Sequence, residues 1–248
     1  RQPLIADFDN DGLQDILITF ADDAHRLYRG TGDCQFEDLT ERAALGGQGL
    51  IAGPALTFDY DRDGLLDIYI GYFGNYLEGN LPNLSRRNFN GTPNKLFRNE
   101  GGFRFREVTL GSGTDNTGWT QALGHTDLDG DGWQDLIVGN DFGINAYLRN
   151  QGDGSFVDIA DALGTNKPSF TMNVGIADLN QDLLPDIYIS NIVTMVKDDK
   201  YVLPSAGTTA HFNLSSLATM RVVDANDLFM SERKDGQLVA HWQARELM

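Results

Sequence analysis

The nine residues Asp7-Phe8-Asp9-Asn10-Asp11-Gly12-Leu13-Gln14-Asp15 carry the pattern on which the fold depends. The pattern is Asp-x-Asp-x-Asp-Gly-x-x-Asp, and it returns at 59–67 and at 127–135. A fourth copy at 178–186 is degraded, because Leu183 stands in place of the glycine. A pattern that recurs along one chain is the signature of a repeat architecture.

Each acidic loop leads into a short apolar segment, which indicates a strand covered on both faces. These segments are Ile16–Ile18, Ile68–Ile70, Leu136–Val138 and Ile187–Ile189. A second shared element follows at Leu27–Gly30, Leu96–Asn99, Tyr147–Asn150 and Leu228–Ser231. A turn and a further apolar position come next, at Phe36, Phe105, Phe156 and Leu238. The repeated unit is therefore strand, acidic loop, strand, connection, strand, turn, strand.

The acidic loops begin 52, 68 and 51 residues apart, at Asp7, Asp59, Asp127 and Asp178. A four-stranded propeller blade takes roughly 40 to 50 residues. We therefore expect one all-β domain over 1–248, built from β-propeller blades that are four-stranded antiparallel repeats. The predicted repeats are 1–48, 49–117, 118–168 and 169–248.

Two insertions, about 74–92 and 192–225, lie at the same connection of repeats two and four. In an antiparallel blade this connection lies at the end opposite the acidic loop. We expect both insertions on the face opposite the acidic loops, and this face is the candidate surface for a protein or glycan partner.

The acidic loops have the composition of calcium sites. Carboxylates at the first, third and fifth positions of a tight loop project to the same side, and glycine at the sixth permits the positive φ of the turn. The carbonyl of the seventh position and the aspartate of the ninth complete an oxygen shell, which suits Ca²⁺ better than Mg²⁺ or Zn²⁺. The predicted side-chain ligands are Asp7, Asp9, Asp11 and Asp15; Asp59, Asp61, Asp63 and Asp67; Asp127, Asp129, Asp131 and Asp135; and Asp178, Asn180, Asp182 and Asp186. The predicted carbonyl ligands are Leu13, Leu65, Trp133 and Leu184.

Three of these sites are predicted to be strong and the fourth weaker. In the fourth loop Asn180 removes one charge, and Leu183 strains the turn that glycine would make freely. A solvated turn is the alternative for any single copy, but four copies in one frame argue against it. An EF-hand would need glutamate at position twelve, where this chain has Ile18, Ile70, Val138 and Ile189.

The charge of the chain excludes some partners and favours others. The 248 residues include 36 acidic residues against 19 Lys and Arg, for a net charge of −17. Nucleic acid and anionic membrane surfaces would repel such a chain, whereas cations would be attracted. The single Cys34 cannot form an intrachain disulfide, and no apolar run is long enough to span a bilayer.

These features resemble the FG-GAP or VCBS-type repeats of calcium-binding β-propellers. The stretch Asn94-Lys95-Leu96-Phe97-Arg98-Asn99, with the glycine turn and Phe105 that follow, is similar to the ASPIC/UnbV group related to cartilage acidic protein. The resemblance implies calcium ligation by the aspartates named above and blades of a propeller that commonly has seven. It also implies a secreted or cell-surface module for adhesion or interaction. Four repeats then indicate a part of a larger propeller or an open blade array.

The sequence contains no motif of an enzyme. The four histidines, His25, His125, His211 and His241, are scattered, and no nucleophile or phosphate-binding motif accompanies them. We therefore expect a non-enzymatic, extracellular calcium-binding protein that acts in adhesion, in protein interaction or as a structural module. A subunit of a self-assembling extracellular polymer, hence a homo-oligomer, is one alternative. The scaffold of a carbohydrate-active enzyme is the other, although no spacing links the insertion acids Glu78, Asp198 and Asp199.

Overall fold

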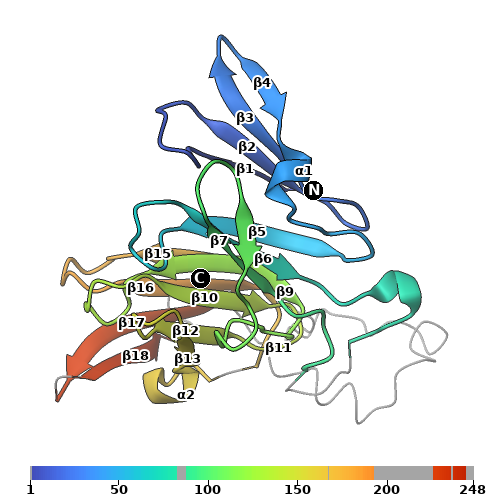
Figure 1. Ribbon diagram of the computed structural model, residues 1–248. Coiled ribbons are helices and arrows are strands. Elements are labelled where there is room, and N and C mark those ends of the chain that lie inside the picture. The colour runs from blue at the N-terminus through green and yellow to red at the C-terminus, as the bar shows by residue number, and fades with distance from the viewer. Residues whose placement is uncertain (1, 83–87, 167, 193–225, 236, 244–248) are drawn as a thin grey trace.

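The computed structural model describes residues 2–82, 88–166, 168–192, 226–235 and 237–243 (Figure 1). It contains four four-stranded antiparallel sheets, each of which we call a blade. The all-β fold of propeller blades predicted from the sequence is therefore confirmed. Among the described residues, no helix is long and apolar enough to cross a membrane.

The blades follow one another along the chain. Blade one contains β1 (Gln2–Ala6), β2 (Asp15–Thr19), β3 (Arg26–Gly32) and β4 (Gln35–Asp38). Blade two contains β5 (Ala52–Phe58), β6 (Asp67–Tyr72), β7 (Lys95–Asn99) and β8 (Phe105–Glu107). Blade three contains β9 (Thr120–Thr126), β10 (Asp135–Asn140), β12 (Ala146–Asn150) and β13 (Phe156–Asp158). Blade four contains β15 (Thr171–Ala177), β16 (Asp186–Asn191), β17 (Asp227–Lys234) and β18 (Gln237–Gln243).

Short elements occupy the connections. The helices α1 (Thr40–Ala43) and α2 (Ala160–Leu163) follow the last strands of blades one and three, and the 3-10 helix η1 (Tyr76–Glu78) lies in the first insertion. The strands β11 (Gly143–Ile144) and β14 (Pro168–Ser169) pair with each other outside the blades. The second insertion lies almost wholly outside the described residues, and so do Asp198, Asp199 and His211.

Successive blades pack face to face through apolar side chains. We call the side of a blade that packs on the following blade its back face, and the opposite side its front face. Leu17 and Leu27 on the back face of blade one form an apolar cluster with Ile68 and Ile70 on the front face of blade two. The same arrangement joins Tyr69 and Leu96 to Leu136 and Val138, and Ile137 and Tyr147 to Ile187 and Ile189. Because blades two and three are covered on both faces, every residue of β6 and β10 is buried.

The first strands of the blades lie at the centre of the array. Neighbouring blades contact one another through these first strands: β1 contacts β5, β5 contacts β9, and β9 contacts β15. The approach between β5 and β9 is close, since a Cβ on Gly53 would lie 2.9 Å from the carbonyl oxygen of Thr120. Glycine at position 53 therefore allows the two backbones to meet.

Buried polar side chains also join the blades. The Asn94 side chain accepts a hydrogen bond from the Tyr72 backbone N–H within blade two (2.8 Å) and another from the Thr120 hydroxyl of blade three (2.9 Å). Asn145 repeats both contacts, with the Asn140 N–H and the Thr171 hydroxyl. A buried acceptor left without a donor would cost roughly 1–3 kcal/mol, so these pairs favour one arrangement of neighbouring blades.

His25 takes the place of this asparagine in blade one. Its Nδ1 accepts a hydrogen bond from the Phe20 N–H (3.3 Å), and its Nε2 lies 2.8 Å from the hydroxyl oxygen of Tyr72 in blade two. The ring is 2% exposed. Burial, with a smaller contribution from the charge of Lys95, lowers the pKa of His25 from 6.5 to about 4.

Acid is therefore expected to destabilise the joint between blades one and two. Between pH 6.5 and 4 the unfolded chain binds a proton at His25 that the folded chain does not, so stability present above pH 6.5 is lost as pH falls. The full effect is roughly 2–4 kcal/mol. Urea unfolding at pH 7.5 and at pH 5 measures the part of this effect that is lost above pH 5, roughly 2 kcal/mol, and His25→Gln is expected to reduce the difference. The exposed His125→Gln serves as the matched control, and an equal pH dependence in all three proteins would contradict the assignment.

Candidate metal centres

The first acidic loop is held by hydrogen bonds from its own backbone. The two carboxylate oxygens of Asp7 accept from the N–H groups of Asp11 (3.1 Å) and Gly12 (2.8 Å). Asp9 accepts a longer bond from the Asp11 N–H, and Asp11 accepts from the Leu13 N–H. The second, third and fourth loops repeat these bonds at equivalent positions.

The sixth position of every loop is in the left-handed region. Gly12, Gly64 and Gly132 have φ of 87°, 86° and 87°, and Leu183 has φ of 69°. A side chain is strained in this region, by roughly 1–2 kcal/mol. The strain that the sequence predicts for the fourth loop is therefore present, and the Leu183 side chain is 90% exposed.

The ninth-position aspartate ties each loop to its blade. Asp67 is fully buried, and its carboxylate accepts hydrogen bonds from the Tyr60 N–H (3.1 Å) and the Asn99 N–H (2.8 Å). Asp15, Asp135 and Asp186 make the equivalent pair of bonds. The ninth-position carboxylate thereby connects the backbone of the second loop position to the backbone of the third strand of the same blade.

Burial also changes the acidity of these aspartates. It raises the pKa of Asp67 and of Asp135 to about 7, although the hydrogen bonds from the backbone oppose the shift. The pKa of Asp15 is raised for the same reason. A charged carboxylate at these positions is therefore costly without a compensating cation.

Three of the four predicted carboxylates converge in each complete loop. Oxygens of the first, third and ninth positions lie within 4.8 Å of one another in the groups Asp7, Asp9 and Asp15; Asp59, Asp61 and Asp67; and Asp127, Asp129 and Asp135. Two ligands of one Ca²⁺ at 2.3–2.6 Å can lie about 4.6–5.2 Å apart at most, so the spacing fits a single ion. The fifth-position aspartates lie outside these groups.

Arginines from the third strands contact the acidic loops. In loop one the Arg29 guanidinium pairs with Asp9 (3.0 Å) and with Asp11 (2.7 Å). In loop two Arg98 pairs with Asp61 (2.6 Å) and Asp63 (3.0 Å), and in loop three Arg149 lies 3.9 Å from Asp129. Sequence reasoning assigned these arginines no role. The sequence feature that could have identified them is the third residue of the second shared element, which is Arg in three repeats and Met230 in the fourth.

The donor set of the loops suits a hard dication. The converging groups are carboxylates, which Ca²⁺ prefers, and no nitrogen or sulfur ligand accompanies them among the described residues. Asp7, Asp9 and Asp15 would hold the ion in loop one, and their equivalents would do so in loops two and three. A bound ion would supply the positive charge that stabilises buried carboxylates. In the fourth loop Asn180 contributes a neutral amide in place of one carboxylate.

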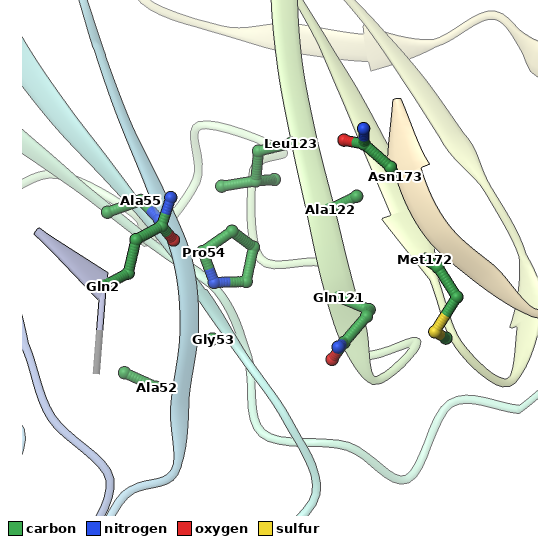
Figure 2. A pocket seen from close by; sticks show the side chains of 10 residues that line it. All are labelled: Gln2, Ala52, Gly53, Pro54, Ala55, Gln121, Ala122, Leu123, Met172 and Asn173. Atoms are coloured by element: carbon green, nitrogen blue, oxygen red, sulfur yellow. The ribbon is translucent and has the colours of Figure 1, made fainter. Parts of the chain in front are cut away.

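A shallow groove runs along the centre of the array, away from the acidic loops. It has a volume of roughly 320 Å³ and is lined by residues of β1, β5, β9 and β15 (Figure 2). Small residues such as Ala52, Gly53 and Pro54 form one wall, and the amides of Gln121 and Asn173 face it from the other side. The side chain of Gln2 is already bonded, since its amide oxygen accepts a hydrogen bond from the Ala55 N–H (3.1 Å). None of the described residues that line this groove has a titratable side chain.

Comparison with known proteins identifies one family and two similar integrin chains. The profile of the FG-GAP-like repeat matches residues 7–70 and 127–189, slightly more than half of the chain. Rat integrin alpha-7 is 24% identical over 196 residues, which is 75% of this chain and 15% of that protein. Mouse integrin alpha-7 is 33% identical over 94 residues, covering 34% of this chain and 8% of that protein. The chain thus spans a small part of the relatives it matches.

Two solved structures are similar in outline. One is BBS1N in complex with ARL6DN, with a TM-score of 0.45, 14% identity, and coverage of 76% of this chain and 50% of that one. The other is the Photorhabdus luminescens Tc holotoxin pore, with a TM-score of 0.42, 19% identity, and coverage of 77% and 8%.

Proposed function

Because the chain belongs to the FG-GAP-like repeat family, we propose that it is a calcium-stabilised propeller-type module that serves adhesion or protein interaction outside the cell. The observation that carries the proposal is the convergence of three carboxylates in each of three loops, within 4.8 Å of one another. Such groups repel one another when charged, and a hard dication removes the repulsion. Calcium at the loops would therefore stabilise the blades that carry any binding surface.

We expect calcium binding to be detectable as heat in a calorimetric titration and as an increase in the melting temperature. After treatment with a chelator and dialysis, titration with Ca²⁺ should show three strong sites and a fourth, weaker one. Saturating Ca²⁺ should raise the melting temperature, since a ligand at 100 times its Kd adds about 2.7 kcal/mol per site. Mg²⁺ is the control ion and should bind more weakly. A melting temperature that is equal in chelator and in Ca²⁺ would refute the proposal.

We place the partner surface at the end of the blades opposite the acidic loops. The first insertion there exposes Tyr76 (48%), Leu77 (61%), Leu81 (68%) and Phe89 (64%). A contiguous exposed apolar patch is typical of an interaction site, and we propose that these side chains form one. A protein partner fits this surface best, and a glycan is the second candidate.

The finer assignment follows the sequence resemblance. We propose that the chain is similar to the ASPIC/UnbV group, on the basis of residues 94–99 and Phe105, and that it is secreted or displayed on a cell surface. We also propose that the four repeats 1–48, 49–117, 118–168 and 169–248 make up one domain, as a part of a larger propeller or an open array.

A binding role is favoured over a catalytic one. The two histidines whose side chains the structure describes do not suggest a site, because His25 is buried and hydrogen-bonded between two blades, and His125 is exposed beside Gln134. Asp141 near the insertion end has a pKa raised by burial to about 6, which is the kind of shift that active sites use. Among the described residues, this carboxyl is the observation that favours the alternative of a carbohydrate-active enzyme, and Asp141→Asn would test any glycosidase activity that is found.

A further inference from the structure

The third-strand arginine contacts two carboxylates of the acidic loop in blades one and two. Nη2 of Arg29 donates a hydrogen bond to the fifth-position Asp11 (2.7 Å), and Nε of Arg29 lies 3.0 Å from the third-position Asp9. In loop two Arg98 repeats both contacts, at 3.0 Å and 2.6 Å. Because neighbouring carboxylates repel each other, a cation in contact with both of them stabilises the loop.

The contact between the arginine and the third-position carboxylate is one of charge. Nε of Arg29 is buried and makes no hydrogen bond to a described residue, although Asp9 is only 3.0 Å away. The Asp9 carboxylate also belongs to the group that converges with Asp7 and Asp15. Asp9 is therefore shared between the guanidinium and the candidate metal centre.

The fourth loop has neither the arginine nor the third-position carboxylate. Asn180 replaces the aspartate, and Met230 replaces the arginine. The Asn180 amide donates a hydrogen bond to Asp182 (3.0 Å), which is the contact that Arg29 makes with Asp11 in loop one. The amide thus supplies the donor that the fifth-position carboxylate takes from an arginine in loops one and two.

The two replacements leave the formal charge of the fourth site unchanged. At the four side-chain ligand positions and the third-strand position, each of the first three blades has four aspartates and one arginine, for a charge of −3. The fourth blade has three aspartates and no charged third-strand residue there, and its charge is also −3. Because the aspartate and the arginine are absent together, the arginine belongs with the third-position carboxylate as its counter-charge.

We propose that Arg29 and Arg98 are internal counter-cations of their acidic loops, which hold the third and fifth carboxylates when no dication is bound and lower the affinity for calcium. A bound ion and the guanidinium would share one carboxylate, so their positive charges would repel each other. At about 6 Å this repulsion weakens binding roughly three- to tenfold, depending on the salt concentration. The inference rests on the proposed function, because it concerns the same loops.

Arg149 is the matched control within the chain. It holds the equivalent position in blade three, but it lies 3.9 Å from Asp129 and donates a hydrogen bond to the Gln151 side chain (3.4 Å). Its charge is therefore less closely engaged with the acidic loop. Arg149→Met should change the calcium affinity of loop three less than Arg29→Met changes that of loop one.

NMR spectra of the glycine amides, recorded in calcium buffers on the chelator-treated chain, measure each loop separately. Gly12, Gly64 and Gly132 hold the sixth positions, and each amide donates a hydrogen bond to the first aspartate of its loop. In Arg29→Met the Gly12 signal should reach half-saturation at a three- to tenfold lower Ca²⁺ concentration than in the unaltered chain. The Gly64 and Gly132 signals should respond as they do in the unaltered chain.

The same substitution should lower stability when calcium is absent. In excess chelator Arg29→Met should unfold at a lower urea concentration than the unaltered chain, because Asp9 and Asp11 lose their counter-charge. The double variant Asp9→Asn/Arg29→Met reproduces the residues of the fourth loop and should regain most of this loss. Circular dichroism spectra confirm that each variant is folded.

The two measurements together distinguish a counter-cation from an arginine that only supports the fold. In the second case Arg29→Met would lower both the stability in chelator and the calcium affinity at Gly12. An unchanged or lower affinity at Gly12, or an unchanged stability in chelator, would overturn the proposal while the calcium sites themselves remain. Glycine signals of the unaltered chain that do not respond to Ca²⁺ would refute the proposed function, and the role of the arginines with it.

Discussion

Replacing Asp67 by alanine is expected to lower the free energy of unfolding by roughly 3–5 kcal/mol, even in the absence of calcium. The carboxylate accepts the Tyr60 and Asn99 N–H groups in a fully buried site, and alanine would leave both donors without a partner. Each such buried donor costs roughly 1–3 kcal/mol. Urea unfolding at pH 7.5 in excess chelator measures this loss.

Measurements with and without calcium distinguish two roles of Asp67, which are attachment of the loop and the proposed binding of the ion. In Ca²⁺ the difference between the unaltered chain and Asp67→Ala should increase further, because the substitution also removes a proposed ligand of loop two. Asp67→Asn retains one acceptor oxygen and should lose less stability than alanine in chelator, yet bind calcium poorly. The control is Glu41→Ala, which removes the same charge from an exposed site on α1. Equal stability of Asp67→Ala and Glu41→Ala would show that the buried aspartate does not hold the loop.

Replacing Trp119 by alanine should be as damaging at the opposite end of the blades. The Trp119 side chain is 1% exposed, lies 4.8 Å from the ring of Phe73 and 5.7 Å from that of Phe142, and donates a hydrogen bond to Asn90 (2.9 Å). Alanine would leave a large cavity, and such changes typically cost about 3–5 kcal/mol. Thermal and urea unfolding, monitored in parallel, measure the loss.

Trp133 provides a matched control for this substitution. It is partly exposed in loop three, and its ring mainly stacks beneath Arg62. Trp133→Ala should therefore cost about 1 kcal/mol, in the range of an exposed cation–π contact. If the two alanine variants lost the same stability, the aromatic cluster around Trp119 would not be a packing centre.

The acidic repeat predicts the blades because its signals are local. The segments Ile16–Ile18 and Ile68–Ile70 are apolar at every position, which predicts strands that are covered on both faces. The glycine of the preceding turn predicts a left-handed backbone at that position. The same local geometry predicts the inward direction of the first, third and ninth carboxylates. It also predicts that Leu183 would adopt a glycine-like backbone, as it does.

In the structure the fifth-position aspartates of loops one and two contact arginines, for a reason that lies outside the loop. Asp11 and Asp63 are directed to Arg29 and Arg98, which arrive from the third strand of each blade. Loop geometry contains no information about that strand, which follows 18 and 35 residues later. Whether these aspartates turn inward when calcium is present stays a prediction.

Local sequence patterns were enough to predict the all-β class, the repeated unit, the positions of its strands and the acidic loops, because each depends on residues within a few positions of one another. The tertiary fold was needed to learn that the fifth-position aspartates face arginines and how successive blades pack on one another. Those features depend on contacts such as Asn99 to Phe8 and Asn150 to Tyr60, between residues about 90 positions apart. Blade packing brings such residues together, and no local pattern encodes its geometry.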